Sequence, residues 1–129
     1  MVKGALVDRF VAAGRKLVEL LDTAQLDIKS AIWLYRAESE DWVLLLAVPG
    51  AERQGPRLVY ERIYDVFVGN LDDLKPLSFE DVVVMSPDEP LPQLFRRALH
   101  TGPGISEIRF SGNRIDSTLI EDALIYRST

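Results

Sequence analysis

The 129-residue sequence predicts an α+β fold, a single domain over residues 1–129. We expect one mostly antiparallel sheet of five to six strands packed by three helices, in the order α-β-β-α-β-α-β-β-β. Two strand-like runs, 31–37 and 42–48, are apolar at nearly every position and flank an acidic turn at 38–41. A half-exposed strand alternates apolar and polar residues, so both faces of this hairpin should be covered. Helical periodicity on either side of the hairpin supplies the covering elements.

The first element should be an amphipathic helix over residues 2–21. Leu6, Phe10, Ala13, Leu17 and Leu20 recur at helical spacing, which defines one apolar side. No strong breaker ends this helix, and the pattern fades over 22–25.

The hairpin that follows carries both tryptophans on one face. A turn centred on Ser39-Glu40 would pair Tyr35 with Leu44 and Trp33 with Leu46. Burying one large side chain fully is worth about 1.5–3 kcal/mol, so we expect the Trp-bearing face to have a packed partner. If the helices leave that face open, it is an interface. The candidate interface residues are Trp33, Tyr35, Trp42 and Leu44.

The middle of the chain should supply a helix, a strand and a helix. Gly55-Pro56 opens a helix that Gly69-Asn70 ends. Tyr60 and Tyr64 flank its apolar stripe. For these two tyrosines and for Trp33 and Trp42 of the hairpin, core packing is the expected role and an aromatic platform for a base or sugar is the alternative. A surface connection over 71–78 leads to a short buried strand at 82–85, and a third helix begins near residue 90 and stops at 102–104.

The last quarter should contain three strands, at 105–110, 114–116 and 123–127. A tight turn at Ser111-Gly112-Asn113 would join the first two, because glycine and asparagine suit positive φ.

Composition excludes several classes of site. The chain has no cysteine and one histidine, so disulfides, thiolate catalysis and Cys-ligated zinc are excluded, and we expect no metal and no cofactor. A net charge of −5 argues against nucleic-acid binding. Charged residues interrupt the apolar N-terminal pattern, so we expect no signal peptide, no membrane span and a cytoplasmic protein.

One region, 96–114, is basic, with four arginines against one glutamate. His100-Thr101-Gly102-Pro103-Gly104 joins the histidine to a glycine-rich turn, which suggests a small-anion or nucleotide pocket: arginine offers paired donors, and glycine lets the backbone approach. The structural alternative is a helix C-cap, since phosphate loops usually precede a helix and this turn follows one. The candidate ligand-binding residues are Arg96, Arg97, His100, Thr101, Gly102, Gly104, Arg109 and Arg114.

A His100-dependent hydrolase is a third hypothesis. Catalysis by His100 needs a group that orients it or accepts its proton, and no spacing selects one acid among Glu107, Asp116, Glu121 and Asp122. No serine or threonine lies in a nucleophile-elbow motif. We therefore assign no catalytic residue and favour a non-enzymatic role.

Several segments resemble short uncharacterised bacterial proteins. They are Gly14-Arg15-Lys16-Leu17, Trp33-Leu34-Tyr35, Thr101-Gly102-Pro103-Gly104-Ile105, Ile108-Arg109-Phe110 and residues 120–127. The resemblance spans most of the length and implies a bacterial, cytoplasmic setting, with no activity or site residue attached. Many small bacterial proteins are immunity, antitoxin or accessory partners. We therefore expect a protein-interaction module whose partner is another protein or a second copy, as in a homodimer, bound through a sheet face or edge.

Overall fold

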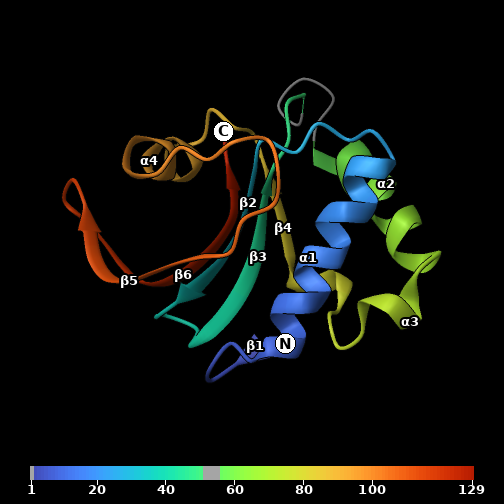
Figure 1. The fold of residues 1–129 in the computed structure, drawn as a ribbon, viewed down its shortest axis with the longest axis horizontal. Helices are drawn as coiled ribbons and strands as arrows, with labels where there is room; N and C mark the ends of the chain where they lie inside the picture. Colours follow the sequence, from blue (N-terminus) through green and yellow to red (C-terminus); the bar gives the residue numbers. More distant parts are fainter. Residues whose placement is uncertain (1, 51–55) are drawn as a thin grey trace.

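The structure is a computed structural model that describes residues 2–50 and 56–129. Within these residues the α+β class is confirmed, with helices packed on one mixed sheet (Figure 1). The helices are α1 (Asp8–Thr23), α2 (Pro56–Val68), α3 (Leu71–Leu74) and α4 (Pro90–Ala98), with a 3-10 turn η1 (Phe79–Asp81). The strands are β1 (Val2–Lys3), β2 (Ser30–Arg36), β3 (Asp41–Ala47), β4 (Val82–Met85), β5 (Ile108–Ile115) and β6 (Thr118–Ser128).

The strand order is β1-β3-β2-β6-β5, and β4 also pairs with β3. The β3–β4 pair is parallel and the other pairs are antiparallel, so the mostly antiparallel sheet is confirmed. β1 and β4 share one edge of β3, because β2 occupies the other.

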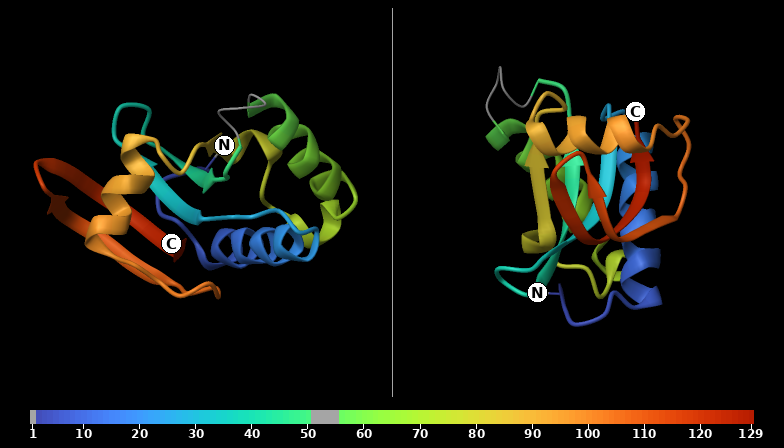
Figure 2. Two further views of the ribbon diagram at one scale, coloured as in Figure 1. Left: turned by 90° about the horizontal axis from the view of Figure 1, so that it is seen from above. Right: turned by 90° about the vertical axis from the view of Figure 1, so that its left-hand side faces the viewer.

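Helices cover both faces of the central hairpin. α1, α2 and α3 lie on one side of the sheet and α4 lies on the other, beside the curled β5–β6 ribbon (Figures 1 and 2). Trp33 and Trp42, with 0% and 2% of their surface exposed, belong to the larger core cluster beneath α1 and α2. Ile32, on the opposite face, packs with Phe95 of α4. The prediction of a hairpin covered on both faces is therefore confirmed.

The predicted register of this hairpin is wrong by two residues. Trp33 lies opposite Leu44, and Tyr35 lies opposite Trp42. The turn comprises residues 37–40 because Arg36 and Asp41 close the ladder, and Arg36 donates to both carboxylate oxygens of Asp41 at 2.9 and 2.8 Å. A shift of two residues leaves every side chain on its predicted face, so the composition of each face is unchanged.

The first helix begins later than predicted. Val2 and Lys3 form β1 beside β3, Gly4 has a φ of +73°, and α1 starts at Asp8. Trp42 Nε1 donates to the Gly4 carbonyl at 2.8 Å. The chain thus adds an edge strand before the helix, a pairing that helical periodicity alone does not reveal.

The C-terminal strands also differ from the prediction. β5 runs through Ser111-Gly112-Asn113 without turning, with Gly112 at a φ of +59° inside the strand. The hairpin turn is instead the two-residue loop Asp116-Ser117, where Asp116 has a φ of +55°. Two predicted strands therefore merge into β5, because positive φ is compatible with an irregular strand as well as with a turn.

The remaining elements lie close to their predicted positions. α2 begins at Pro56 as predicted, while Gly55 of the predicted helix start lies outside the described residues. β4 spans the predicted strand, and α4 begins at Pro90 as predicted but ends at Ala98, before the predicted stop at 102–104. The predicted connection over 71–78 contains the short helix α3. In the ranges 2–50 and 56–129, no helix has both the length and the apolar character needed to cross a membrane.

A buried hydrogen-bond chain fixes α1 on the sheet. Trp33 Nε1 donates to the Tyr126 hydroxyl at 2.9 Å, and this hydroxyl donates to the Val11 carbonyl of α1. Gly14 allows the approach, because a Cβ there would lie 2.5 Å from the Tyr126 oxygen and 2.7 Å from Trp33 Nε1. The absence of one side chain on α1 is therefore a condition of this packing.

We predict that Gly14→Ala lowers the free energy of unfolding by about 1–3 kcal/mol, because overpacking must displace Tyr126 or Trp33. Helix propensity alone would make the alanine variant more stable by about 1 kcal/mol. The predicted loss of stability therefore has the opposite sign to the effect of helix propensity. Urea unfolding measures the change. Gly69→Ala is the control, since its Cβ would have ordinary contacts of 3.5 Å or more, and it should change stability by less than about 0.5 kcal/mol. Equal effects at both glycines would contradict the packing argument.

We also predict that alkaline pH destabilises the fold through Tyr126. Burial raises the pKa of Tyr126 above its ordinary value of 10.0, so the unfolded chain loses this proton at a lower pH than the folded chain. Stability should be independent of this group below pH 10.0 and fall above it by up to about 1.4 kcal/mol per pH unit. Urea unfolding of the wild type and Tyr126→Phe across that range measures the difference. Parallel curves would contradict the prediction.

Candidate functional site

The arginines of the basic region 96–114 do not meet in one pocket. Arg97 donates two hydrogen bonds to Asp116, and Arg114 donates to the Ser117 carbonyl. Arg96 and Arg97 line an open depression of about 410 Å³ with His100 and Gln93 on the exposed side of α4. Only part of the predicted ligand set is therefore brought together.

Arg109 lies elsewhere, on β5. Its guanidinium donates to both carboxylate oxygens of Asp122, and its Cζ is 5.5 Å from the centre of the Trp42 ring. The hydrogen bonds from Arg109 hold the pKa of Asp122 below its ordinary value. The charge of Arg109 is thus already matched by a carboxylate of the same hairpin.

The glycine-rich turn is held by a different arginine, Arg127 of β6, which is 5% exposed. Arg127 donates to the Gly104 and Ile28 carbonyls and, at 2.9 and 2.8 Å, to both carboxylate oxygens of Asp22. Arg127 therefore ties the 100–104 turn to the C-terminal end of α1. These contacts use its Nε and both terminal nitrogens for structural bonds.

His100, Thr101 and Gly102 line a pocket of about 450 Å³ beside Arg127. Its charged side chains are paired, Arg127 with Asp22 and Lys29 with Asp27 at 3.3 Å. Thr101 is buried and supports the backbone, because its hydroxyl accepts the Ser128 N–H and donates to the Gly102 carbonyl. This pocket carries no excess positive charge that would hold an anion.

Three of the four acids considered as partners of His100 are bound to arginines instead. Glu107 pairs with Arg15, while Asp116 and Asp122 pair with Arg97 and Arg109. His100 itself is exposed, and among residues 2–50 and 56–129 no hydrogen bond to its ring is formed. Within the described part of the chain, no side chain is therefore placed to orient the His100 ring by a hydrogen bond.

The residues predicted for an interface lie mostly in the core of one chain. Trp33, Trp42 and Leu44 are buried, and Tyr35 is half-buried with its ring centroid 5.5 Å from that of Trp42. α1 and the segment before it provide their cover, through Phe10 and Gly4. A partner would have to contact the chain at other residues.

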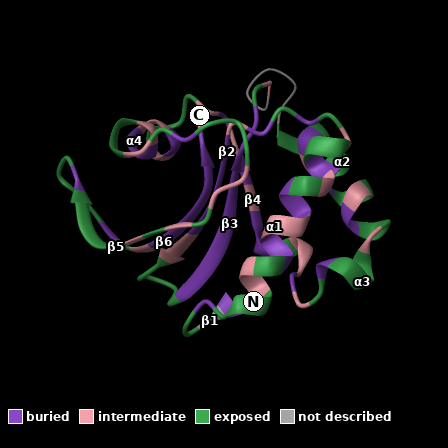
Figure 3. Cartoon of the chain, in the orientation of Figure 1, coloured by how far each residue is buried: buried purple, intermediate pink, exposed green. Residues whose placement is uncertain are grey.

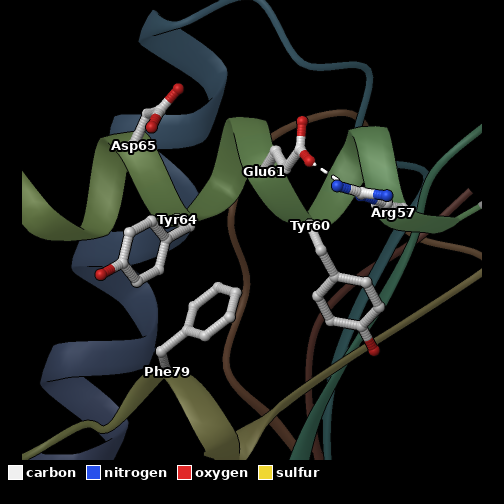
Figure 4. A pocket seen from close by; sticks show the side chains of 6 residues that line it. All are labelled: Arg57, Tyr60, Glu61, Tyr64, Asp65 and Phe79. Atoms are coloured by element: carbon white, nitrogen blue, oxygen red, sulfur yellow. Dashed lines mark hydrogen bonds and ion pairs between the residues drawn. The ribbon is translucent and has the colours of Figure 1, made fainter.

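Tyr60 and Tyr64 of α2, with Phe79 of η1, form an aromatic cluster at the surface (Figure 4). The Phe79 ring packs edge-on with both tyrosines, at centroid distances of 6.1 Å from Tyr60 and 5.2 Å from Tyr64. Beneath them Phe67 is buried, and Tyr60 Oη accepts the Val84 N–H of β4 at 2.8 Å. The rings are therefore fixed before any ligand arrives.

These rings line an open pocket of about 420 Å³. Arg57, Glu61 and Asp65 complete its lining, and Figure 4 shows the two carboxylates extending from the helix away from the rings. Arg57 Nε donates to Glu61 at 3.1 Å, so one carboxylate is paired within the helix. We call the six lining residues the aromatic pocket: Arg57, Tyr60, Glu61, Tyr64, Asp65 and Phe79.

Exposed apolar side chains gather on the same two helices, α2 and α3. Of the six large apolar residues that are exposed in the described chain, four are Leu58, Tyr64, Val68 and Leu71, with exposed fractions of 46–53%. Figure 3 shows that much of α2 and α3 is turned to solvent, whereas β2 and β3 are largely buried. We call these four residues together with the aromatic pocket the α2–α3 face.

Sequence reasoning identified only part of these sites. Tyr60 and Tyr64 were identified beside the apolar stripe of α2 as members of a possible aromatic platform, whereas its other two members, Trp33 and Trp42, are buried. Phe79 lies in a segment without periodicity and joins the tyrosines only through the tertiary fold. Arg127 carried a weak signal, a charge at the end of an apolar strand. Its partner Asp22 is 105 residues away in the sequence, so the pairing has no local pattern.

Within the described residues, no group of three or more histidines, aspartates or glutamates is arranged to hold a metal ion. Comparison of the chain with protein-family models, curated proteins and solved structures found no match.

We predict that Arg127→Lys lowers the free energy of unfolding by about 1–3 kcal/mol, because lysine cannot reproduce the forked hydrogen bonds to Asp22 and the two carbonyls. Arg97→Lys is the matched control: its ion pair with Asp116 is also two-pronged but more than half exposed. The control should change stability by less than about 0.5 kcal/mol in urea unfolding. Equal losses of stability in the two variants would contradict the prediction that the buried ion pair contributes more than the exposed one.

Proposed function

We propose that this chain is a non-enzymatic protein-interaction module that contacts another protein through its α2–α3 face. The observation that carries the proposal is the concentration of exposed apolar side chains there, including Tyr64 and Leu71, each more than half exposed. Exposed apolar side chains concentrated on one part of a protein surface are typical of protein–protein contacts.

The aromatic pocket supports the proposal. Tyrosine is enriched among residues that dominate binding energy, and such residues act best in pre-formed, well-packed pockets. Tyr60 and Phe79 are fixed by their contacts with β4 and Phe67, so a partner side chain would enter without reordering them. Little conformational entropy would therefore be lost at this surface on binding.

The face of the sheet does not compete for this role. Its tryptophans are covered within the chain, and the exposed edge strand β5 carries two arginines and a kink at Gly112, features that discourage strand addition. We further propose a bacterial cytoplasmic protein of the immunity, antitoxin or accessory type. The absence of cysteine and the resemblance to short bacterial proteins are compatible with that setting.

We predict that Tyr64→Ser and Leu71→Ser abolish capture of a partner that the wild-type chain retains from a native lysate. Truncating a central aromatic anchor costs about 2 kcal/mol or more, roughly a thirtyfold loss of affinity. Both positions are exposed, so stability should change by less than about 0.5 kcal/mol in thermal unfolding.

Leu119→Ser is the matched control, because Leu119 is 48% exposed but lies on β6, outside the α2–α3 face. It should retain the partner. Loss of capture in all three variants, or in none, would overturn the proposal. Light scattering at several protein concentrations measures self-association. If the wild type forms a dimer and Tyr64→Ser does not, the partner is a second copy of the chain.

A further inference from the structure

We infer that the aromatic pocket receives a long basic side chain, arginine or lysine, from a segment of the partner protein. The inference rests on the proposed function, since it names the chemistry of the partner at the same surface. Two observations carry it: the acidic charge of the segment that builds the face, and the arrangement of rings and carboxylates in the pocket.

The segment that forms the α2–α3 face has an excess of acidic residues. Residues 56–81 contain six carboxylates and three basic side chains, a net charge of −3 out of −5 for the whole chain. Asp81 is buried, so five exposed carboxylates against three exposed basic side chains leave a net charge of −2 at the surface of this segment. Electrostatic complementarity steers association and rejects partners of like charge. A second copy docked through the same face would place two acidic surfaces together, which disfavours it as the occupant.

The pocket separates an apolar floor from a charged rim. Tyr60, Tyr64 and Phe79 supply aromatic surface on one side of α2, while the carboxylates of Glu61 and Asp65, which line the same pocket, extend from the helix away from the rings (Figure 4). Arginine and lysine side chains match this arrangement, because their aliphatic stems pack on apolar surface while their charged ends remain in polar surroundings. The stem would lie on the rings and the charged group would reach the rim.

Each part of that contact has a physical basis. A cation near the face of a tyrosine or phenylalanine ring is attracted by its quadrupole, which adds to the ion pair with a carboxylate. Asp65 is the better candidate of the two acids, because Glu61 is already bonded to Arg57 at 3.1 Å. The pocket should therefore bind a charged side chain more tightly than a neutral side chain of the same shape, because of Asp65.

The experiment compares two small probes by amide chemical-shift titration of the full chain: Nα-acetyl-arginine amide and its uncharged isostere, Nα-acetyl-citrulline amide. The arginine amide should shift the signals of α2 and η1 and bind at least about threefold more tightly than the citrulline amide. Equal shifts from both probes, no shift in α2, or shifts centred elsewhere would overturn the inference.

Asp65→Asn should reduce the preference for arginine at least about twofold, whereas Asp73→Asn should leave it unchanged. Both changes remove one charge from the same acidic segment, but only Asp65 lines the pocket. An equal effect of the two would mean that general charge, and not this pocket, selects the probe, and would overturn the inference.

The two proposals fail separately. If Tyr64→Ser abolishes partner capture while the two probes bind alike, the interaction face stands and the basic side chain is refuted. If the arginine preference is measured but capture survives Tyr64→Ser and Leu71→Ser, the pocket binds cations and the proposed function is refuted.

Discussion

The contact of Trp33, Tyr126 and Gly14 is the constraint on which the rest of the structure depends. It joins α1 and β2 to β6, which is far from both in the sequence, by two hydrogen bonds through the Tyr126 hydroxyl. Buried donors left unpaired would cost about 1–3 kcal/mol each, so α1 has one position in which both are satisfied. α2 and α3 then pack against α1, and their outer surface is set by that docking.

The way the core is divided explains why apolar surface remains on α2 and α3. The central hairpin is apolar on both faces, and α1 and α4 cover most of it. α2 contributes a narrow buried stripe, Val59, Ile63 and Phe67. Leu58, Tyr64 and Val68 of the same helix remain about half exposed. The apolar side chains of α2 that the core does not bury therefore remain available to a partner.

Charge behaves differently from apolar surface in this fold. The arginines that cluster in the sequence at 96–114 do not converge on one pocket, and all four donate hydrogen bonds within the chain. Arg97 and Arg109 bond to carboxylates, and Arg96 and Arg114 bond to backbone carbonyls. The two carboxylates lower the local positive charge, so this basic stretch of sequence does not become one basic site. The acidic segment 56–81 keeps its excess, because its carboxylates outnumber its basic residues.

The sequence by itself determined the helices, the central strands and which residues of the hairpin share a face, because these follow from local periodicity of apolar side chains. It did not determine the hairpin register, the position of the last turn or strand β1, since these depend on pairing between strands. Tyr60 and Tyr64 could be picked out on one side of α2, but not their contact with Phe79. Only tertiary structure decided that contact and the Arg127–Asp22 pair, because both join segments whose separation leaves no periodic signal.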